Sequence, residues 1–144
     1  MSRLRAHRAR RIVDMRAAAV DRIEVELGDL TRRTLEIAES MRLVREAWQA
    51  AVSQPAAPLC TSADLVQAHD YRLGLTRRID TLAADERRAR IEEDACRKRL
   101  CAAKAELRKI EMWRDGLLEA AGAEESMIER KATDEVAARI ARNA

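Results

Sequence analysis

The chain has 144 residues, of which 37% are charged and 47% are apolar, and its 28 Lys and Arg residues nearly balance its 25 Asp and Glu residues. Phe is absent and aromatic residues make up 2%, so Ala, Leu, Ile and Val must supply the buried surface. This composition is typical of a narrow interface between helices and argues against a globular core. The net charge of +3 does not by itself indicate a nucleic-acid-binding protein.

The start of the chain is a local positive pole. Asp14 is the single acidic residue there, against Arg3, Arg5, Arg8, Arg10, Arg11 and Arg16. Later segments mix both signs of charge. A positive end on an otherwise balanced chain suits an acidic or mixed partner surface.

Apolar residues recur in alternating steps of three and four through the first half of the chain. This spacing indicates a coiled coil, because 3.5 residues per turn keep one stripe of side chains facing a partner helix. We expect a first helix from about residue 4 to residue 53. Its stripe consists of Val13, Arg16, Val20, Ile23, Leu27, Leu30, Thr34, Ile37, Met41, Val44, Trp48 and Ala51.

The only two prolines, Pro55 and Pro58, end this helix, because proline lacks a backbone N–H and disfavours helix at the preceding residue. Residues 54–61 are therefore the predicted tip. Thr61 or Ser62 is the expected N-cap of a second helix over about 62–142, with Asp64 in its first turn. Its stripe consists of Leu65, Ala68, Arg72, Leu75, Ile79, Leu82, Glu86, Ala89, Glu93, Cys96, Leu100 and Ala103.

One antiparallel register pairs the two stripes throughout. It sets Trp48 opposite Ala68 and Glu93 opposite Ile23, with each pair of residue numbers summing to 116. We therefore expect an all-α fold, a long antiparallel two-helix coiled-coil hairpin with an overhanging C-terminal helix, as a single domain over residues 1–144. In this register residues 115–144 have no partner in the first helix. They still carry a largely apolar helical face, marked by Leu118, Ala121, Glu125, Ile128, Ala132, Val136 and Ile140.

Nothing in the sequence indicates catalysis. His7 and His69 are expected at opposite ends of the hairpin, and no Gly-rich phosphate loop or metalloprotease motif occurs. The cysteines, Cys60, Cys96 and Cys101, form no CxxC pair, so we expect neither a disulfide framework nor a zinc site. No apolar run is long enough to span a membrane or to act as a secretory signal. We predict a protein that is not an enzyme, with no cofactor and no metal.

Trp48 and Tyr71 are the aromatic residues near the tip, and the predicted register places them side by side. They have two interpretations. Either they thicken the seam near its open end, or they anchor a partner protein at the tip, since Trp and Tyr dominate interface hot spots.

Three stretches resemble the flagellar FliJ and injectisome YscO family, the central stalk proteins of type III secretion ATPases. They are the tip segment "CTSADLVQAHDYRLGLTRRIDTL", the C-terminal "ERKATDEVAARIARNA" and the N-terminal "LRAHRARRIVDMRAAAVDR". The resemblance covers most of the chain. It implies a protein that binds the hexameric export ATPase with its termini, couples that ATPase to the export gate, and promotes secretion.

The resemblance also implies residues and a location. The residues that bind the export gate would be Ile37, Met41, Val44, Trp48, Tyr71 and Leu75, of which Val44 stands where the family often has an aromatic residue. The residues that bind the ATPase would be Arg5, Arg8, Arg11, Ile128, Glu129, Arg130, Lys131, Asp134 and Glu135. Secretion chaperones are a further candidate partner, and neither nucleic acid nor membrane insertion is expected. The protein would be cytoplasmic in bacteria, peripheral to the secretion apparatus at the inner membrane.

Three other functions fit part of this pattern. A coiled-coil chaperone or structural adaptor fits the apolar stripes, because the stripes alone do not indicate which partner the protein binds. A basic helical hairpin that binds nucleic acid would use the Arg-rich start and show strong salt dependence. A transcript-cleavage-factor type of hairpin needs clustered carboxylates at its tip to hold Mg²⁺, and residues 53–65 contain Asp64 alone.

Overall fold

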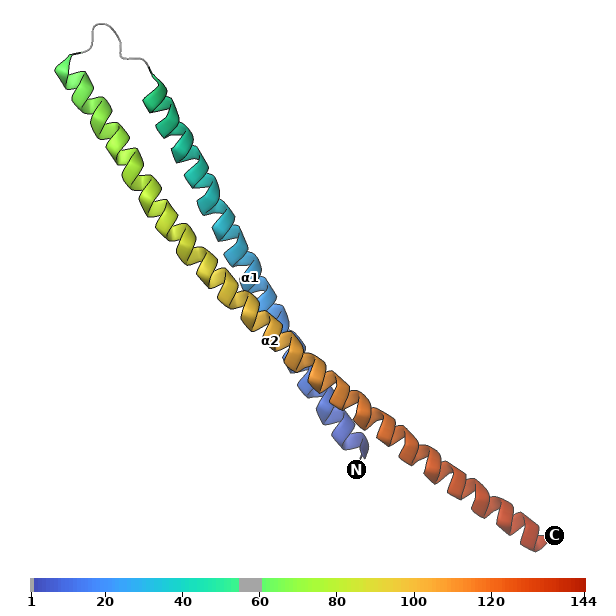
Figure 1. Cartoon of the computed structure of the whole chain (residues 1–144). Helices are drawn as coiled ribbons and strands as arrows, with labels where there is room; N and C mark the ends of the chain where they lie inside the picture. The colour runs from blue at the N-terminus through green and yellow to red at the C-terminus, as the bar shows by residue number, and fades with distance from the viewer. Residues whose placement is uncertain (1, 55–60) are drawn as a thin grey trace. The chain divides into compact units, whose positions relative to one another are not determined.

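Two long α-helices make up nearly all of the described chain. The computed structural model describes residues 2–54 and 61–144, and Figure 1 shows helix α1 (Ser2–Ser53) and helix α2 (Ser62–Asn143). The sequence predicted about 4–53 and 62–142 for these helices. No strand occurs over the described ranges and the helices pack against each other, so the predicted all-α helical hairpin is confirmed. Most of the predicted tip, residues 55–60, lies outside the described residues.

A capping box fixes the start of α2. The Thr61 hydroxyl accepts a hydrogen bond from the Asp64 backbone N–H at 3.3 Å, and the Asp64 carboxylate accepts one from the Thr61 N–H at 3.1 Å. Both bonds satisfy backbone donors that the first turn of a helix leaves without partners. Thr61, rather than Ser62, is therefore the N-cap, a role that contributes about 0.5–2 kcal/mol to helix stability.

The contacts divide the chain into two compact units. The central unit is Ile23–Arg99, and the terminal unit is Met1–Arg22 with Leu100–Ala144. Each unit contains one segment of α1 and one segment of α2, which run antiparallel. The single domain expected over residues 1–144 stays a prediction.

The central unit is held by a seam along the predicted stripes. Its buried side chains are Met41, Val44, Ala89, Glu93 and Cys96, with Cys96 completely buried. The Cys96 thiol donates a hydrogen bond to the Ile23 carbonyl across the seam, with a sulfur to oxygen distance of 3.8 Å. Two ion pairs flank the seam: Arg99 with Glu26 at 2.7 Å and Arg33 with Glu92 at 3.8 Å. From the pair Glu26 and Arg99 to the pair Arg33 and Glu92, residue numbers rise along α1 and fall along α2, which establishes the antiparallel pairing.

The predicted register of this seam is wrong by about one heptad. Glu93 hydrogen-bonds Thr31, although the prediction set it opposite Ile23. Trp48 likewise shares a surface hollow with Thr76 and Ile79, although the prediction set it opposite Ala68. A shift of one heptad keeps every stripe residue on the stripe, so periodicity alone gives the two registers equal support.

A buried carboxylate distinguishes the two registers. Glu93 is 7% exposed, accepts a hydrogen bond from the Thr31 hydroxyl at 3.2 Å and pairs with Arg97 one turn along α2. A buried carboxylate is costly unless it is paired and hydrogen-bonded. The observed register supplies a hydroxyl from α1, whereas the predicted one faces the carboxylate with the apolar Ile23.

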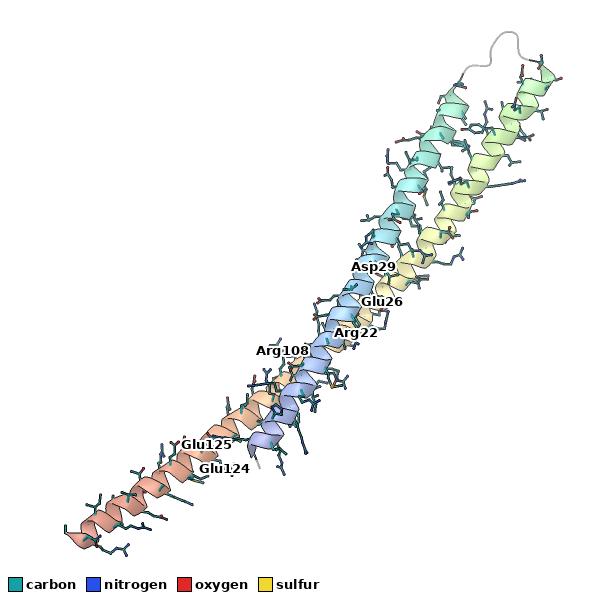
Figure 2. All side chains as sticks on the ribbon, turned by 180° about the vertical axis from the view of Figure 1, so that it is seen from behind. Arg22, Glu26, Asp29, Arg108, Glu124 and Glu125 are labelled. Carbon is teal, nitrogen blue, oxygen red and sulfur yellow. The ribbon has the colours of Figure 1, made fainter. Side chains whose placement is uncertain are left out.

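Small side chains fill the interface of the terminal unit. Its buried residues are Ala6, Ala9, Val13, Val20 and Ala121. Alanines allow two helix backbones to approach closely, because little volume separates them. An ion pair between Arg3 and Glu125 lies at the end of this interface, and Figure 2 shows Glu125 on α2 beside the first turns of α1.

The C-terminal overhang is shorter than predicted. Residues 115–144 were expected to lack a partner in α1, but Ala121 is buried and Glu125 pairs with Arg3. The same register error accounts for this difference, because the correct register brings α1 further along α2. Residues 126–144 are exposed throughout, and Figure 1 shows this end of α2 continuing past the start of α1. We call residues 126–144 the overhang.

Candidate functional site

The six residues predicted to bind an export gate all lie in the central unit, but their environments differ. Met41 and Val44 are buried, and Ile37 and Leu75 are half-buried. Trp48 is 37% exposed and Tyr71 is 56% exposed. Met41, Val44, Ile37 and Leu75 are thus buried, fully or in part, in the interface between the helices. Trp48 and Tyr71 are the members of the set with the most surface to offer a partner.

Trp48 and Tyr71 line two different hollows. Trp48 lies in a hollow of about 330 Å³ with Arg45, Gln49, Thr76 and Ile79. Tyr71 lines a second hollow, whose other residues are Ala47, Ala50, Ala51, Gln54, Ala68 and Arg72. The expectation that the two rings lie side by side across the seam rested on the register that proved wrong.

The two hollows differ in the residues that line them. The Trp48 hollow has an apolar floor, formed by the indole and Ile79, and a polar rim that includes Arg45 and Gln49. Four alanines line the Tyr71 hollow, three from α1 and one from α2, and Tyr71 itself is exposed. An exposed aromatic ring beside a small apolar depression can receive an apolar side chain from a partner, while its polar edge fixes orientation.

The residues predicted to bind an ATPase all lie in the terminal unit and are exposed. On α1 they are Arg5, Arg8 and Arg11. On the overhang they are Ile128, Glu129, Arg130, Lys131, Asp134 and Glu135, with Ile128 61% exposed. Within the described residues no ion pair joins Arg5, Arg8 or Arg11 to a carboxylate. Their charges are therefore available to an acidic partner.

The overhang also presents an apolar face. Val136 is 55% exposed and Ile140 is 66% exposed, and both follow Ile128 at helical spacing. Residues 126–144 are all exposed, so no part of the described chain buries this face.

Sequence reasoning missed a hollow on one edge of the terminal unit. It measures about 410 Å³ and is lined by Arg3, Ala6, His7, Arg10, Leu118, Ala121, Gly122 and Glu125. Arg3 hydrogen-bonds Glu125 and so lowers the pKa of that carboxyl below its ordinary value. The signal in the sequence was the set of small residues at 121 and 122, which the erroneous register left without a partner helix.

The cysteines have different environments where the structure describes them. Cys96 is buried in the seam and Cys101 is exposed, while Cys60 lies outside the described residues. Over residues 2–54 and 61–144, no cluster of His, Cys, Asp and Glu has the geometry to hold a metal ion. In the same ranges, neither helix contains an apolar stretch suited to crossing a membrane.

A protein-family model matches nearly the whole chain. The model of the family described as Flagellar FliJ protein matches residues 6–144. Neither a curated protein nor a solved structure gives a significant match. The match includes both helices of the hairpin and the overhang.

Proposed function

The chain belongs to the FliJ family, and on that premise we propose that it is the central stalk protein of a flagellar or injectisome type III secretion system. Family membership supports a stalk role in flagellar or type III export in general. The finer proposal is that the protein binds the hexameric export ATPase, couples it to the export gate and promotes secretion. The observation that carries it is the match of the family model over residues 6–144.

The terminal unit supplies the proposed ATPase contact. Its overhang exposes Ile128, Val136 and Ile140, a face that needs cover from another protein. The free arginines of the first turns of α1 add positive charge in the same unit. A partner surface with apolar positions and carboxylates would match both features.

The central unit supplies the proposed gate contact. Of the six predicted residues, we assign the main contact to Trp48 and Tyr71, because Met41 and Val44 are buried. Ile37 and Leu75 are half-buried, so they offer a partner less surface than the two rings do.

The FliJ family is a structural component of the export apparatus and not a known enzyme. We accordingly propose no catalytic residue for this chain. Association with the export ATPase apparatus follows from the family in general, and secretion chaperones remain candidate partners. The family is a cytoplasmic part of that apparatus, and we propose that this protein lies there, peripheral to the inner membrane.

The ATPase contact is tested with a pair of surface variants. Ile128→Ser with Ile140→Ser removes two exposed apolar side chains of the overhang. Val25→Ser with Ile91→Ser removes two of the central unit that are equally exposed, at 67% and 68%. We expect the first variant to lose binding to the purified export ATPase and its stimulation, and the second to retain both. Equal binding by the two variants would show that the overhang is not the contact.

The gate contact is tested with Trp48→Leu combined with Tyr71→Leu, which keeps apolar side chains at both positions. We expect binding to the cytoplasmic domain of the export gate to weaken by about 1–2 kcal/mol or more, with ATPase binding unchanged. Leu43→Ser is the matched control, because Leu43 is an exposed apolar residue of the same unit. Unchanged gate affinity in the folded double variant would contradict the assignment. Salt-dependent binding to DNA duplexes, without ATPase binding, would favour the nucleic-acid alternative.

A further inference from the structure

The second tryptophan of the chain lies on a surface that the proposed contacts do not use. Trp113 is 50% exposed, and Met112 beside it is 67% exposed. On α1 of the same unit, Ile12 is 40% exposed and Met15 is 71% exposed. We call Ile12, Met15, Met112 and Trp113 the Trp113 surface.

The helix register places Ile12 and Trp113 on one edge of the terminal unit. Ile12 directly precedes the buried Val13, and Trp113 directly precedes the half-buried Arg114. In an antiparallel pair, residues that precede the seam on both helices lie along the same edge. Glu26 and Arg99 also precede seam residues, and they form an ion pair. In an antiparallel register, residues that lie opposite each other have a constant sum of residue numbers, and this sum is 125 both for Glu26 with Arg99 and for Ile12 with Trp113. The two side chains are therefore level with each other.

The helix surface one turn after Trp113 is open. Gly116 follows Trp113 by about one helical turn, and a Cβ atom built at Gly116 would meet nothing within 4 Å. A partner backbone can therefore approach α2 closely at Gly116, beside the exposed Trp113. Trp and Met are among the side chains enriched in the core of protein interfaces, and the surface contains both.

The border of the Trp113 surface is positive. Arg8 precedes Ile12 by one turn and Arg11 precedes Met15 by one turn, so both guanidinium groups border the apolar side chains. Neither forms an ion pair within residues 2–54 and 61–144. The opposite edge of the unit differs, because Glu125 already neutralises Arg3 there.

We propose that the Trp113 surface docks an amphipathic helix of a partner protein, whose apolar residues are flanked by carboxylates. Apolar side chains would cover the indole and Ile12, and the carboxylates would pair with Arg8 and Arg11. A second copy of the chain fits this surface poorly, because a two-fold contact brings the arginines of both copies together. Arg8 and Arg11 also belong to the proposed ATPase contact, so the charged border rests on the same residues as that function. The inference goes beyond it in the apolar surface, since none of the four apolar residues belongs to the ATPase or gate sets.

The proposal is tested by fluorescence on the full chain. Trp48→Phe leaves Trp113 as the only tryptophan, so its emission reports on this surface alone. One probe is a synthetic amphipathic helix with Leu on one face and Glu flanking it, and the control peptide carries Lys in place of each Glu. We expect a saturable blue shift with the Glu peptide, weakened by added salt, and affinity lower by about ten-fold or more for the Lys peptide.

Variants separate this surface from the rest of the unit. Ile12→Ser with Trp113→Ser, measured by calorimetry, should weaken binding of the Glu peptide by about ten-fold or more. Leu118→Ser is the matched control, because Leu118 is 40% exposed, as Ile12 is, and lies on the opposite edge. It should leave peptide affinity unchanged. Arg8→Glu with Arg11→Glu changes exposed side chains only and should abolish the preference for the Glu peptide.

Three results would overturn the proposal. They are equal affinity for the Glu and Lys peptides, equal loss of binding in the Leu118 control, and a blue shift of Trp113 that follows protein concentration alone, which indicates self-association. The apolar variants separate this surface from the ATPase contact, because Ile12 and Trp113 do not belong to the ATPase set. The Ile128→Ser with Ile140→Ser variant should still bind the Glu peptide, and the Ile12→Ser with Trp113→Ser variant should still bind the ATPase.

Discussion

The central and terminal units use the same coiled-coil spacing but bury different side chains. The central unit buries Met41 and Val44 and satisfies the carboxylate of Glu93 between its helices. The terminal unit buries mainly alanines, while Trp113, Met112 and Met15 remain outside. Burial contributes about 25 cal/mol per Å² of apolar area, so an alanine interface stabilises less per residue than one of larger side chains.

This difference suggests a division of roles. The central unit has a polar contact that distinguishes one register from its neighbours, and it therefore defines how the helices pair. The terminal unit buries smaller side chains and exposes the apolar face of the overhang, so it is better suited to binding than to holding the hairpin together.

The largest effect is expected from crosslinking, which reads the register of the central unit directly. With the native cysteines replaced, Val44→Cys combined with Ile79→Cys should form a disulfide within one chain, because the observed register opposes them. Ile37→Cys with Ile79→Cys should not, because the Cα atoms of residues a heptad apart in register are too distant for a disulfide. Mass spectrometry under mild oxidation measures both. The opposite result would restore the register predicted from the sequence.

The helix ends could be predicted from the sequence and the register could not, for one physical reason. The N-cap at Thr61, the helix ends near Ser53 and Asn143, and the apolar stripes depend on local residue types, which a sequence states directly. Register depends on which stripe residues meet. Heptads are alike, so a shift by one heptad preserves the apolar pattern and changes only a few polar contacts.

The errors at the candidate sites followed from the register. The pairing of Trp48 with Tyr71 and the start of the overhang at residue 115 both came from counting along the wrong alignment. The contact between Glu93 and Thr31 was the available signal, because a stripe carboxylate needs a polar residue opposite or beside it. Trp113 was overlooked because it precedes a stripe position and was not on the stripe itself.

The next effect in size concerns the core of the central unit. Met41→Ala removes a side chain that is 4% exposed, so it should lower the free energy of unfolding by about 2–5 kcal/mol. Urea denaturation followed by circular dichroism measures the change. Met15→Ala is the control in the terminal unit, where Met15 is 71% exposed, and should change stability by about 0.5 kcal/mol or less. Similar losses from the two variants would contradict the difference between the units.

A smaller loss of stability is expected in the terminal unit when a buried side chain is enlarged instead of shortened. Ala9 is 0% exposed, and Ala9→Leu forces extra volume between closely spaced helices. It should destabilise the protein by about 1–3 kcal/mol. Ala18→Leu places the same side chain at an exposed position of the same helix and should be nearly neutral. Hydrogen exchange should localise the loss of protection to the terminal unit. A neutral Ala9→Leu would show that the alanine interface is loosely packed.

The smallest effect concerns one exposed ion pair in each unit. Arg99 hydrogen-bonds Glu26 in the central unit, and Arg3 hydrogen-bonds Glu125 in the terminal unit; each interaction lowers the pKa of the carboxyl from its ordinary value of 4.5. A lowered pKa means that the contribution to stability is present above pH 4.5 and is lost as the pH falls through the folded-state pKa. Exposed pairs contribute little to stability, so the titration is the sensitive measurement.

Carbon-13 spectra of the Glu carboxyl groups should therefore give pKa values below 4.5 for Glu26 and Glu125, and Arg99→Gln or Arg3→Gln should return its own partner to the ordinary value. Added salt should reduce both shifts. The two values also compare the units. If the alanine interface opens more often than the central seam, the shift of Glu125 averages over open states and becomes smaller than that of Glu26. A Glu125 shift that persists under mild denaturant as long as the Glu26 shift does would show that the two interfaces open together, and would remove the proposed difference in their stability.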